Sequence, residues 1–379
     1  MFLPFYFIKF NILGIGFNIV EIFILICALF TVIDQVGMKK IQIGNYWVYI
    51  FLLLSFVSVF FANDKIGALG IFKGWFLIPV MVYFCVINFK QKYEFLAWPL
   101  VINLFLVLII AIGQKLHIID TVFYQHSLKS AFEQYLGSNL RVFGPFDSPN
   151  FLAMYLVPII FLILALSRQI KDKKLSIISW VLMVWAICVL YWTKSAGGSL
   201  ALTCAIIFIL ISAQIKDKKI QKITLSAFCV ILLVGIFYGI NNDPIRRDLM
   251  HYTWILITQN PILGIGLGDF QSRLNMLDLS NSFRQFGYPY ALHPHNLFLA
   301  QWLNLGILGL LVFTKILLDF FKTNFKQNSL PIIFLTAAMV AILVHGLVDT
   351  TYYKNDLAII FWLIIALSFN LKDEKRETA

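Results

Sequence analysis

The side chains in this sequence that best suit group-transfer chemistry are a few arginines and two histidines. Arg141 lies in the run RVFGPFDSPN, and Arg246 and Arg247 lie side by side in DPIRRDL. A guanidinium is always charged and presents a planar fork that suits phosphate or pyrophosphate oxygens. These residues are therefore candidates for holding a diphosphate, although an arginine at a membrane surface, such as Arg141, can equally contact lipid headgroups.

The paired arginines stand where a helix is expected to begin. Asp243 and Pro244 have the residue types of a helix cap and a first turn, which places Arg246 and Arg247 in that turn. Cations there oppose the helix dipole, and a nearby anion would remove this conflict. The glycines at 264, 266 and 268 resemble a phosphate-cradling loop, but no strand precedes them, so we reject a dinucleotide-binding fingerprint.

His293 and His295 occur in the sequence HPHN, immediately before an apolar run. Histidine is the side chain best suited to proton transfer near neutral pH. Two histidines and a carboxylate could instead bind zinc, and a structural role in capping the next helix is a third interpretation. Because a proline separates the two histidines at i, i+2, the spacing is not typical of metal ligands, and we predict no metal and no cofactor.

Four ionisable residues fall within apolar runs: Glu21, Lys73, His345 and Asp349. Such groups cost several kcal/mol in lipid unless they face a cavity or a partner. We interpret Lys73 as a snorkelling or packing lysine. His345 and Asp349 are spaced i, i+4, so on one helix they would share a face and could hydrogen-bond. They would serve either as a proton relay in a transporter or as support for an external site, and their position near a span end favours the second.

The elements that position these residues are predicted to be transmembrane helices. The chain has 379 residues, of which 60% are hydrophobic and 13% charged, with a mean hydropathy of +0.84. Apolar runs of about 20 residues recur throughout, and in lipid such runs must be helical because their backbone groups have to pair internally. We predict an all-α polytopic membrane protein with about 11–12 spans, in which residues 1–17 could hold the additional one. The eleven spans lie at roughly 12–33, 46–62, 66–88, 95–113, 150–167, 176–193, 199–214, 223–240, 297–318, 331–350 and 357–371.

Basic residues cluster in alternate connections between these spans. The clusters are Lys39–Lys40, Lys90–Lys92, Arg168–Lys174, Lys216–Lys222, Lys322–Lys326 and Lys372–Arg376. By the positive-inside rule they are cytoplasmic, so the net charge of +11 reflects topology rather than nucleic-acid binding, and the C-terminus is inside. Residues 1–379 then form one transmembrane domain. Its two long external loops, 114–149 and 241–296, are predicted to form the active site.

Four blocks, in this order, resemble the O-antigen ligase and O-antigen polymerase superfamily of bacterial membrane glycosyltransferases. They are RVFGPFDSPNFLAMYL, TKSAGGSLAL, PILGIGLGDF with the arginines before it, and HPHNLFLAQWLNLGILGL, which HGLVD follows. Each block is degenerate, but their order and topology are specific, and they cover roughly Gly137 to Leu371.

The resemblance implies a GT-C-like fold and a reaction at the outer face of the inner membrane. A glycan would pass from a polyprenyl (undecaprenyl) diphosphate carrier to an acceptor hydroxyl on a glycan, a lipid or a protein, with inversion and without a metal. The activity would be that of a ligase or a polymerase in O-antigen or surface polysaccharide synthesis. The alternative from a different class is a multi-span transporter or flippase of lipid-linked glycans.

Positions that match the family motifs imply roles for individual residues. Arg141 and Arg246 correspond to two essential arginines, with Arg247 as a close competitor of Arg246, and His295 corresponds to the catalytic histidine. The family often has Ser-Arg-Gly where this chain has Ser-Ala-Gly at 195–197, and Lys194 could supply that charge. The residues predicted to bind substrate are Arg247, His293, Asn296, Lys194 and Asp349.

Overall fold

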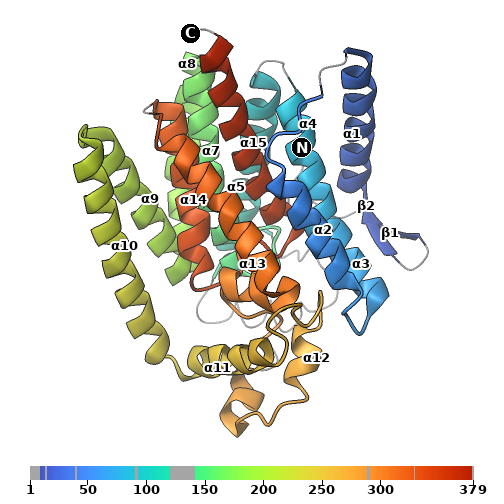
Figure 1. The fold of residues 1–379 in the computed structure, drawn as a ribbon. Helices are drawn as coiled ribbons and strands as arrows, with labels where there is room; N and C mark the ends of the chain where they lie inside the picture. The colour runs from blue at the N-terminus through green and yellow to red at the C-terminus, as the bar shows by residue number, and fades with distance from the viewer. Residues whose placement is uncertain are drawn as a thin grey trace.

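Long helices that run in alternating directions make up most of the chain (Figure 1). The computed structural model describes residues 9–12, 15–38, 41–89, 93–119, 141–287, 291–327 and 329–377. Within these residues the helices begin with α1 (Ile19–Met38), α2 (Trp47–Val59), α3 (Lys65–Phe72), the π-helix η1 (Lys73–Leu77), α4 (Ile78–Asn88), α5 (Glu94–Lys115), α7 (Pro149–Ile170) and α8 (Lys173–Thr193). They are followed by α9 (Ala196–Gln214), α10 (Lys218–Asn241), α11 (Pro244–Gln259), α12 (Phe270–Leu274), the π-helix η2 (Phe283–Gly287), α13 (Leu297–Asn324), α14 (Leu330–Gly346) and α15 (Asn355–Glu377).

Every predicted span contains a helix. Among the described residues, seven helical stretches are long and apolar enough to cross a membrane: Lys65–Asn88, α5, α7, α8, α9, α10 and α13. Shorter apolar helices occupy the predicted spans of α2, α14 and the first part of α15, and α1 occupies the first. These helices support the prediction of an all-α polytopic membrane protein.

The N-terminal region departs from the prediction. Strands β1 (Lys9–Ile12) and β2 (Ile15–Asn18) pair antiparallel, so the first helix does not begin near residue 12 as predicted. It begins at Ile19, because Asn18 and Glu21 form a reciprocal cap. The Asn18 side-chain oxygen accepts from the Glu21 amide (3.0 Å), and Glu21 Oε2 accepts from the Asn18 amide (3.2 Å). The structure shows strands, not an additional span, at residues 9–12 and 15–17. The other residues of the segment 1–17 lie outside the described part.

Lys73 and Glu21 form an ion pair inside the bundle instead of facing lipid. Lys73 Nζ lies 2.5 Å from Glu21 Oε2, and the two side chains are 11% and 3% exposed. Asn355 Nδ2 donates to the other Glu21 oxygen at 3.2 Å. Lys73 is therefore a packing residue and not a snorkelling one, since pairing offsets the cost of burying both charges.

The glycine-rich loop at 261–268 packs against a break in α13. Gly306 has φ +71° inside that helix, and a Cβ there would lie 1.8 Å from the Ile262 carbonyl oxygen. The amide of Ile265 donates to the Leu303 carbonyl at 2.8 Å, and that of Ile307 donates to the Pro261 carbonyl at 3.0 Å. These glycines permit the loop backbone to approach the α13 backbone closely. Helix packing therefore accounts for the glycines, in agreement with the rejection of a dinucleotide-binding fingerprint.

The bundle has two distinct ends (Figure 1). The C-terminus lies at one end, and α11 crosses the opposite end beneath α10 and α13. Because successive spans alternate in direction, the start of α7, the end of α8, the starts of α9 and α13 and the end of α14 all meet at the end where α11 lies. The long segment 241–296 contains α11, α12 and η2, whereas 120–140 of the first long loop lie outside the described residues.

Candidate functional site

The pair formed by His295 and Asp349 is the centre of the candidate site. His295 Nδ1 lies 3.0 Å from Asp349 Oδ1, and the two side chains are 30% and 6% exposed. His295 has φ +48°, a strained conformation for a residue with a Cβ. With Nδ1–H donating to the carboxylate, Nε2 is the ring nitrogen left to accept a proton.

Asn296 fixes the backbone on which His295 stands. Its side-chain oxygen accepts from the amides of Phe298 and Leu299, both at 3.0 Å, which caps α13. Its Nδ2 donates to the Leu347 carbonyl at 3.0 Å, which joins the start of α13 to the loop that carries Asp349. Its predicted role in binding substrate stays a prediction, and both polar atoms of this side chain are engaged in positioning the loop.

Asp349 reaches His295 because it is not on a helix. The predicted span at 331–350 is too long, since α14 ends at Gly346, and residues 347–354 form an irregular loop. The amide of Val348 donates to the His345 carbonyl at 3.0 Å, and Thr351 Oγ1 donates to the Ile342 carbonyl at 2.9 Å, which folds this loop back on the helix end. The expected i, i+4 helical pairing of His345 with Asp349 is therefore wrong. No hydrogen bond joins His345 to Asp349 among the described residues, and Nδ1 of His345 has no hydrogen-bond partner there.

Asn150 connects this pair to Arg141. Its Nδ2 lies 3.4 Å from Asp349 Oδ2, and its Oδ1 accepts from Arg141 Nη2 at 3.2 Å. Arg141 Nε donates to the carbonyl of Thr193 at 2.8 Å, at the end of α8. Sequence reasoning did not assign Asn150 a role. The signal available was its place in the first turn of α7, directly after the arginine motif and the Ser148 cap.

A second cation lies beside the same turn of α7. Lys354 Nζ is 2.6 Å from Asp147 Oδ2 and 4.8 Å from the centre of the Phe151 ring. We assigned Lys354 no role from the sequence. The fold brings it to Asp147 because the loop after α14 lies against the start of α7.

Arg246, on α11, lies close enough to His345 for its charge to act on that ring. As predicted, Asp243 caps that helix, with its Oδ1 accepting from the Arg246 amide at 3.2 Å, and its Oδ2 lies 3.4 Å from Arg246 Nε. The Arg246 side chain is 44% exposed, and its charge acts on His345. The neighbouring Arg247 is also exposed and makes no ion pair among the described residues, and the choice between Arg246 and Arg247 stays a prediction. Lys194, also exposed, ends α8 in a left-handed conformation at φ +51°.

Burial and neighbouring charges set the ionisation of the site. Burial, reinforced by the charge of His295, lowers the pKa of His293 to about 4, so its ring is neutral at neutral pH. Burial alone would raise the pKa of Asp349, but the charge and hydrogen bond of His295 outweigh it and hold that pKa below its usual range. The site therefore pairs an ionised carboxylate with His295 beside a neutral imidazole, which lies edge-on to the His295 ring at 5.2 Å.

The same three side chains could hold a metal ion by distance alone. Each of His293, His295 and Asp349 offers one ligand atom, and these atoms all lie within 4.8 Å of one another. Nδ1 of His293 is buried without a partner among the described residues, whereas Nδ1 of His295 already bonds the carboxylate. The prediction of no metal stays a prediction, to be tested by chelation.

A family model described as O-antigen ligase matches residues 181–314. Over these residues the chain is similar to the O-antigen ligase family. This match supports the resemblance to the O-antigen ligase and polymerase superfamily, and with it an O-antigen ligase-type activity in a multi-pass membrane protein. No curated protein matches the sequence.

The O-antigen ligase segment contains only part of the site. Lys194, Arg246, Arg247 and the histidine block at 293–296 fall within it. Arg141, Asn150 and Asp349 lie outside it and join the site through the hydrogen bonds described above.

Proposed function

We propose that this protein is a glycosyltransferase that moves a glycan from a polyprenyl (undecaprenyl) diphosphate to an acceptor hydroxyl. The single observation that carries the proposal is the bond of 3.0 Å between His295 Nδ1 and Asp349 Oδ1, in a chain whose O-antigen ligase segment includes that histidine. Such a pair is suited to removing a proton from a hydroxyl group, because the carboxylate orients the ring and stabilises its protonated form.

The attacking group is an acceptor hydroxyl, and His295 Nε2 takes its proton. The oxygen forms a bond to C1 of the donor sugar as the bond from C1 to the diphosphate oxygen breaks, and the electron pair leaves with the diphosphate. Attack from the face opposite the leaving group inverts the anomeric centre. No metal is required in this scheme, since cationic side chains provide the charge stabilisation.

Arg141 and Arg246 are assigned to the leaving diphosphate. Arg141 is tied to Asp349 through Asn150, and the Arg246 charge acts on His345. Positive charge aimed at a leaving group that gains negative charge lowers the barrier, and removing one such group typically costs about 10²–10³ in rate. The predicted contributions of Arg247, His293 and Lys194 to substrate binding are secondary to these.

The reaction is placed at the external face of the inner membrane. Three of the basic clusters, Arg168–Lys174, Lys216–Lys222 and Lys322–Lys326, lie at the ends of α7, α9 and α13 that are opposite α11, and the C-terminus lies at the same end. By the positive-inside rule we assign this end to the cytoplasm. The site would then lie where a lipid-linked glycan is exposed to its acceptor, within the GT-C-like helical frame that the resemblance implies.

The test is a transfer assay with purified protein in detergent and an undecaprenyl-diphosphate glycan as donor. Wild type is expected to lengthen or transfer the glycan, whereas Arg141→Ala, Arg246→Ala and His295→Ala each reduce the rate by about a hundredfold or more. His251→Ala, an exposed histidine on α11, serves as the matched control. Near-normal transfer by His295→Ala would exclude the base assignment. An unchanged glycan that crosses the bilayer of reconstituted vesicles would instead establish a flippase.

A further inference from the structure

An apolar groove runs along the membrane-spanning faces of α9 and α10, at the edge of the bundle (Figure 1). Its volume is about 470 Å³, within the range of roughly 300–1,000 Å³ that is usual for ligand sites. Leu200 of α9 and Gly235 and Gly239 of α10 are among its lining residues. The wall is almost entirely aliphatic and aromatic, so it fits hydrocarbon rather than a sugar.

The groove is open because α10 makes little use of its surface for packing. Of the residues of α10, all of which the structure describes, only Gln221 is buried. A Cβ added at Gly235 or Gly239 would meet no other atom within 4 Å. The two glycines therefore leave space along the groove without being required by a close backbone contact.

The groove has one charged residue in its lining, and that residue is Arg246. Gly197 and Val348 also line it, and both adjoin the candidate site. A Cβ at Gly197 would lie 2.7 Å from His345 Nε2, and Val348 precedes Asp349 in the chain. The apolar groove thus ends at a cation whose charge acts on His345, beside the loop that carries Asp349.

We propose that this groove holds the polyprenyl chain of the donor, with the diphosphate at Arg246. The inference rests on the proposed function and adds to it the path of the lipid. From Phe228 to Ile240, both of which line the groove, α10 rises by roughly 18 Å, over half of the hydrocarbon thickness of a bilayer. A long hydrocarbon that ends in an anion matches both the length and the charge distribution.

The groove would act by position rather than by hydrophobic attraction. Bilayer lipid is as apolar as the groove wall, so moving the chain from lipid into the groove gains little from burial alone. Holding the first part of the chain instead fixes the diphosphate relative to Arg246 and His295. Misplacement of reacting groups by about 1 Å can cost on the order of a hundredfold in rate.

The test fills the groove without disturbing the fold. Gly235→Trp and Gly239→Trp place a large ring in open space, and Gly70→Trp on α3 is the matched control, because a Cβ at Gly70 likewise meets nothing within 4 Å. Retention of undecaprenyl diphosphate is measured by native mass spectrometry, with geranyl diphosphate and phosphatidylglycerol as comparison ligands. Transfer is measured in parallel with undecaprenyl- and geranyl-diphosphate glycans.

We expect wild type and Gly70→Trp to retain undecaprenyl diphosphate, and both groove variants to lose about tenfold in retention and in kcat/KM for the long-chain donor. With the geranyl donor, which leaves most of the groove empty, all four proteins should agree within about threefold. Equal behaviour of all four with the long-chain donor would overturn the proposal. Equal retention of phosphatidylglycerol would also overturn it, since the groove would then hold any bilayer lipid. A change of oligomeric mass in the groove variants would overturn it as well, since a second copy of the chain would then cover the groove.

The two proposals fail in different ways. If the groove variants lose undecaprenyl diphosphate while wild type binds it without transferring any glycan, the groove assignment stands and the glycosyltransferase proposal does not. If wild type transfers glycan and the groove variants match it, the enzyme assignment stands and the groove assignment does not.

Discussion

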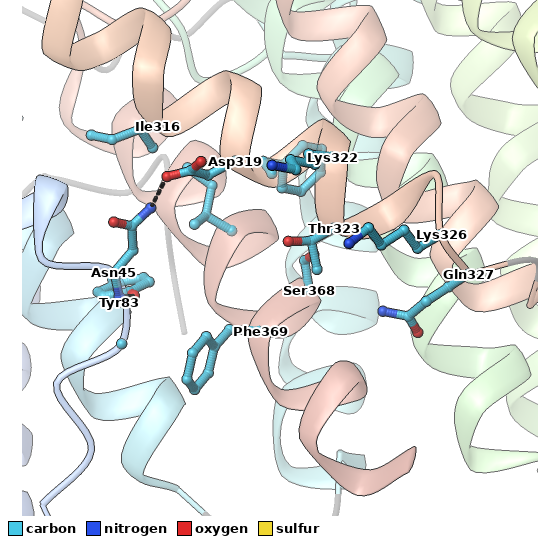
Figure 2. A pocket seen from close by; sticks show the side chains of 13 residues that line it. Asn45, Tyr83, Ile316, Asp319, Lys322, Thr323, Lys326, Gln327, Ser368 and Phe369 are labelled. Atoms are coloured by element: carbon cyan, nitrogen blue, oxygen red, sulfur yellow. Dashed lines mark hydrogen bonds between the residues drawn. The ribbon is translucent and has the colours of Figure 1, made fainter. Parts of the chain in front are cut away.

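The two ends of the helix bundle hold their polar residues in different ways. At the end near α11, the link from Arg141 through Asn150 to Asp349 and His295 joins residues far apart in the sequence. At the opposite end lies a cavity of about 500 Å³ (Figure 2), whose lining includes Asp319, Lys322 and Lys326. There, Asp319 pairs with Lys315 one turn earlier on the same helix and accepts from Asn45 Nδ2 at 3.2 Å.

This difference supports our assignment of the proposed reaction to the end near α11. The Lys315–Asp319 pair lies within one helix at a half-exposed position, where an ion pair contributes little. A link across three loops and the first turn of α7 holds a histidine, a carboxylate and an arginine in a fixed arrangement, as a reaction centre requires. The cavity lined by Asp319 is larger than the apolar groove between α9 and α10, but it is not the candidate site, because it lacks a histidine and lies away from His295.

The largest effect should come from changing the carboxylate at each end in the same way. Asp349→Asn keeps the size of the side chain but removes the charge that orients His295, and the amide can stabilise the wrong tautomer of the ring. We expect kcat for glycan transfer to fall by about 10²–10⁴. Asp319→Asn should stay within about threefold of wild type. Comparable losses in the two variants would show that the ends do not differ in function.

A smaller effect should come from the residue that only links the others. Asn150→Ala breaks the connection between Arg141 and Asp349 but leaves both charges, so we expect a loss of about tenfold in kcat. Asn45→Ala, which removes the amide that donates to Asp319, is the matched control and should leave kcat unchanged. The pH profile separates the two roles of Asn150. A positioning role shifts the acid limb that reports His295, whereas a purely structural role lowers activity without changing the profile.

The smallest effect should come from chelation. His293, His295 and Asp349 could hold a metal by distance, but the proposed mechanism uses the His295–Asp349 hydrogen bond instead. Prolonged treatment of the purified protein with EDTA should leave transfer unchanged, as measured by the rate and by metal analysis of the treated sample. Loss of transfer that returns on addition of Zn²⁺ would assign the three side chains to a metal centre.

Local rules predicted much of the molecule. The apolar runs predicted the helices because backbone groups in lipid must pair within a segment, and Asp243 with Pro244 predicted the start of α11. The sequence also identified Arg141, Arg246 and His295 as candidate site residues. It did not predict the β1–β2 hairpin, whose pairing runs between short apolar strands that resemble the beginning of a span.

The sequence by itself determined that the chain crosses a membrane many times and carries arginines and histidines suited to group transfer. These properties follow from residue type and from local spacing. Only the tertiary structure decided that Asn150 links Arg141 to Asp349, that α14 ends at Gly346 so that Asp349 can reach His295, and that Arg246 stands at the end of an apolar groove. These contacts join segments up to about two hundred residues apart, and their geometry depends on how the helices pack rather than on any local pattern.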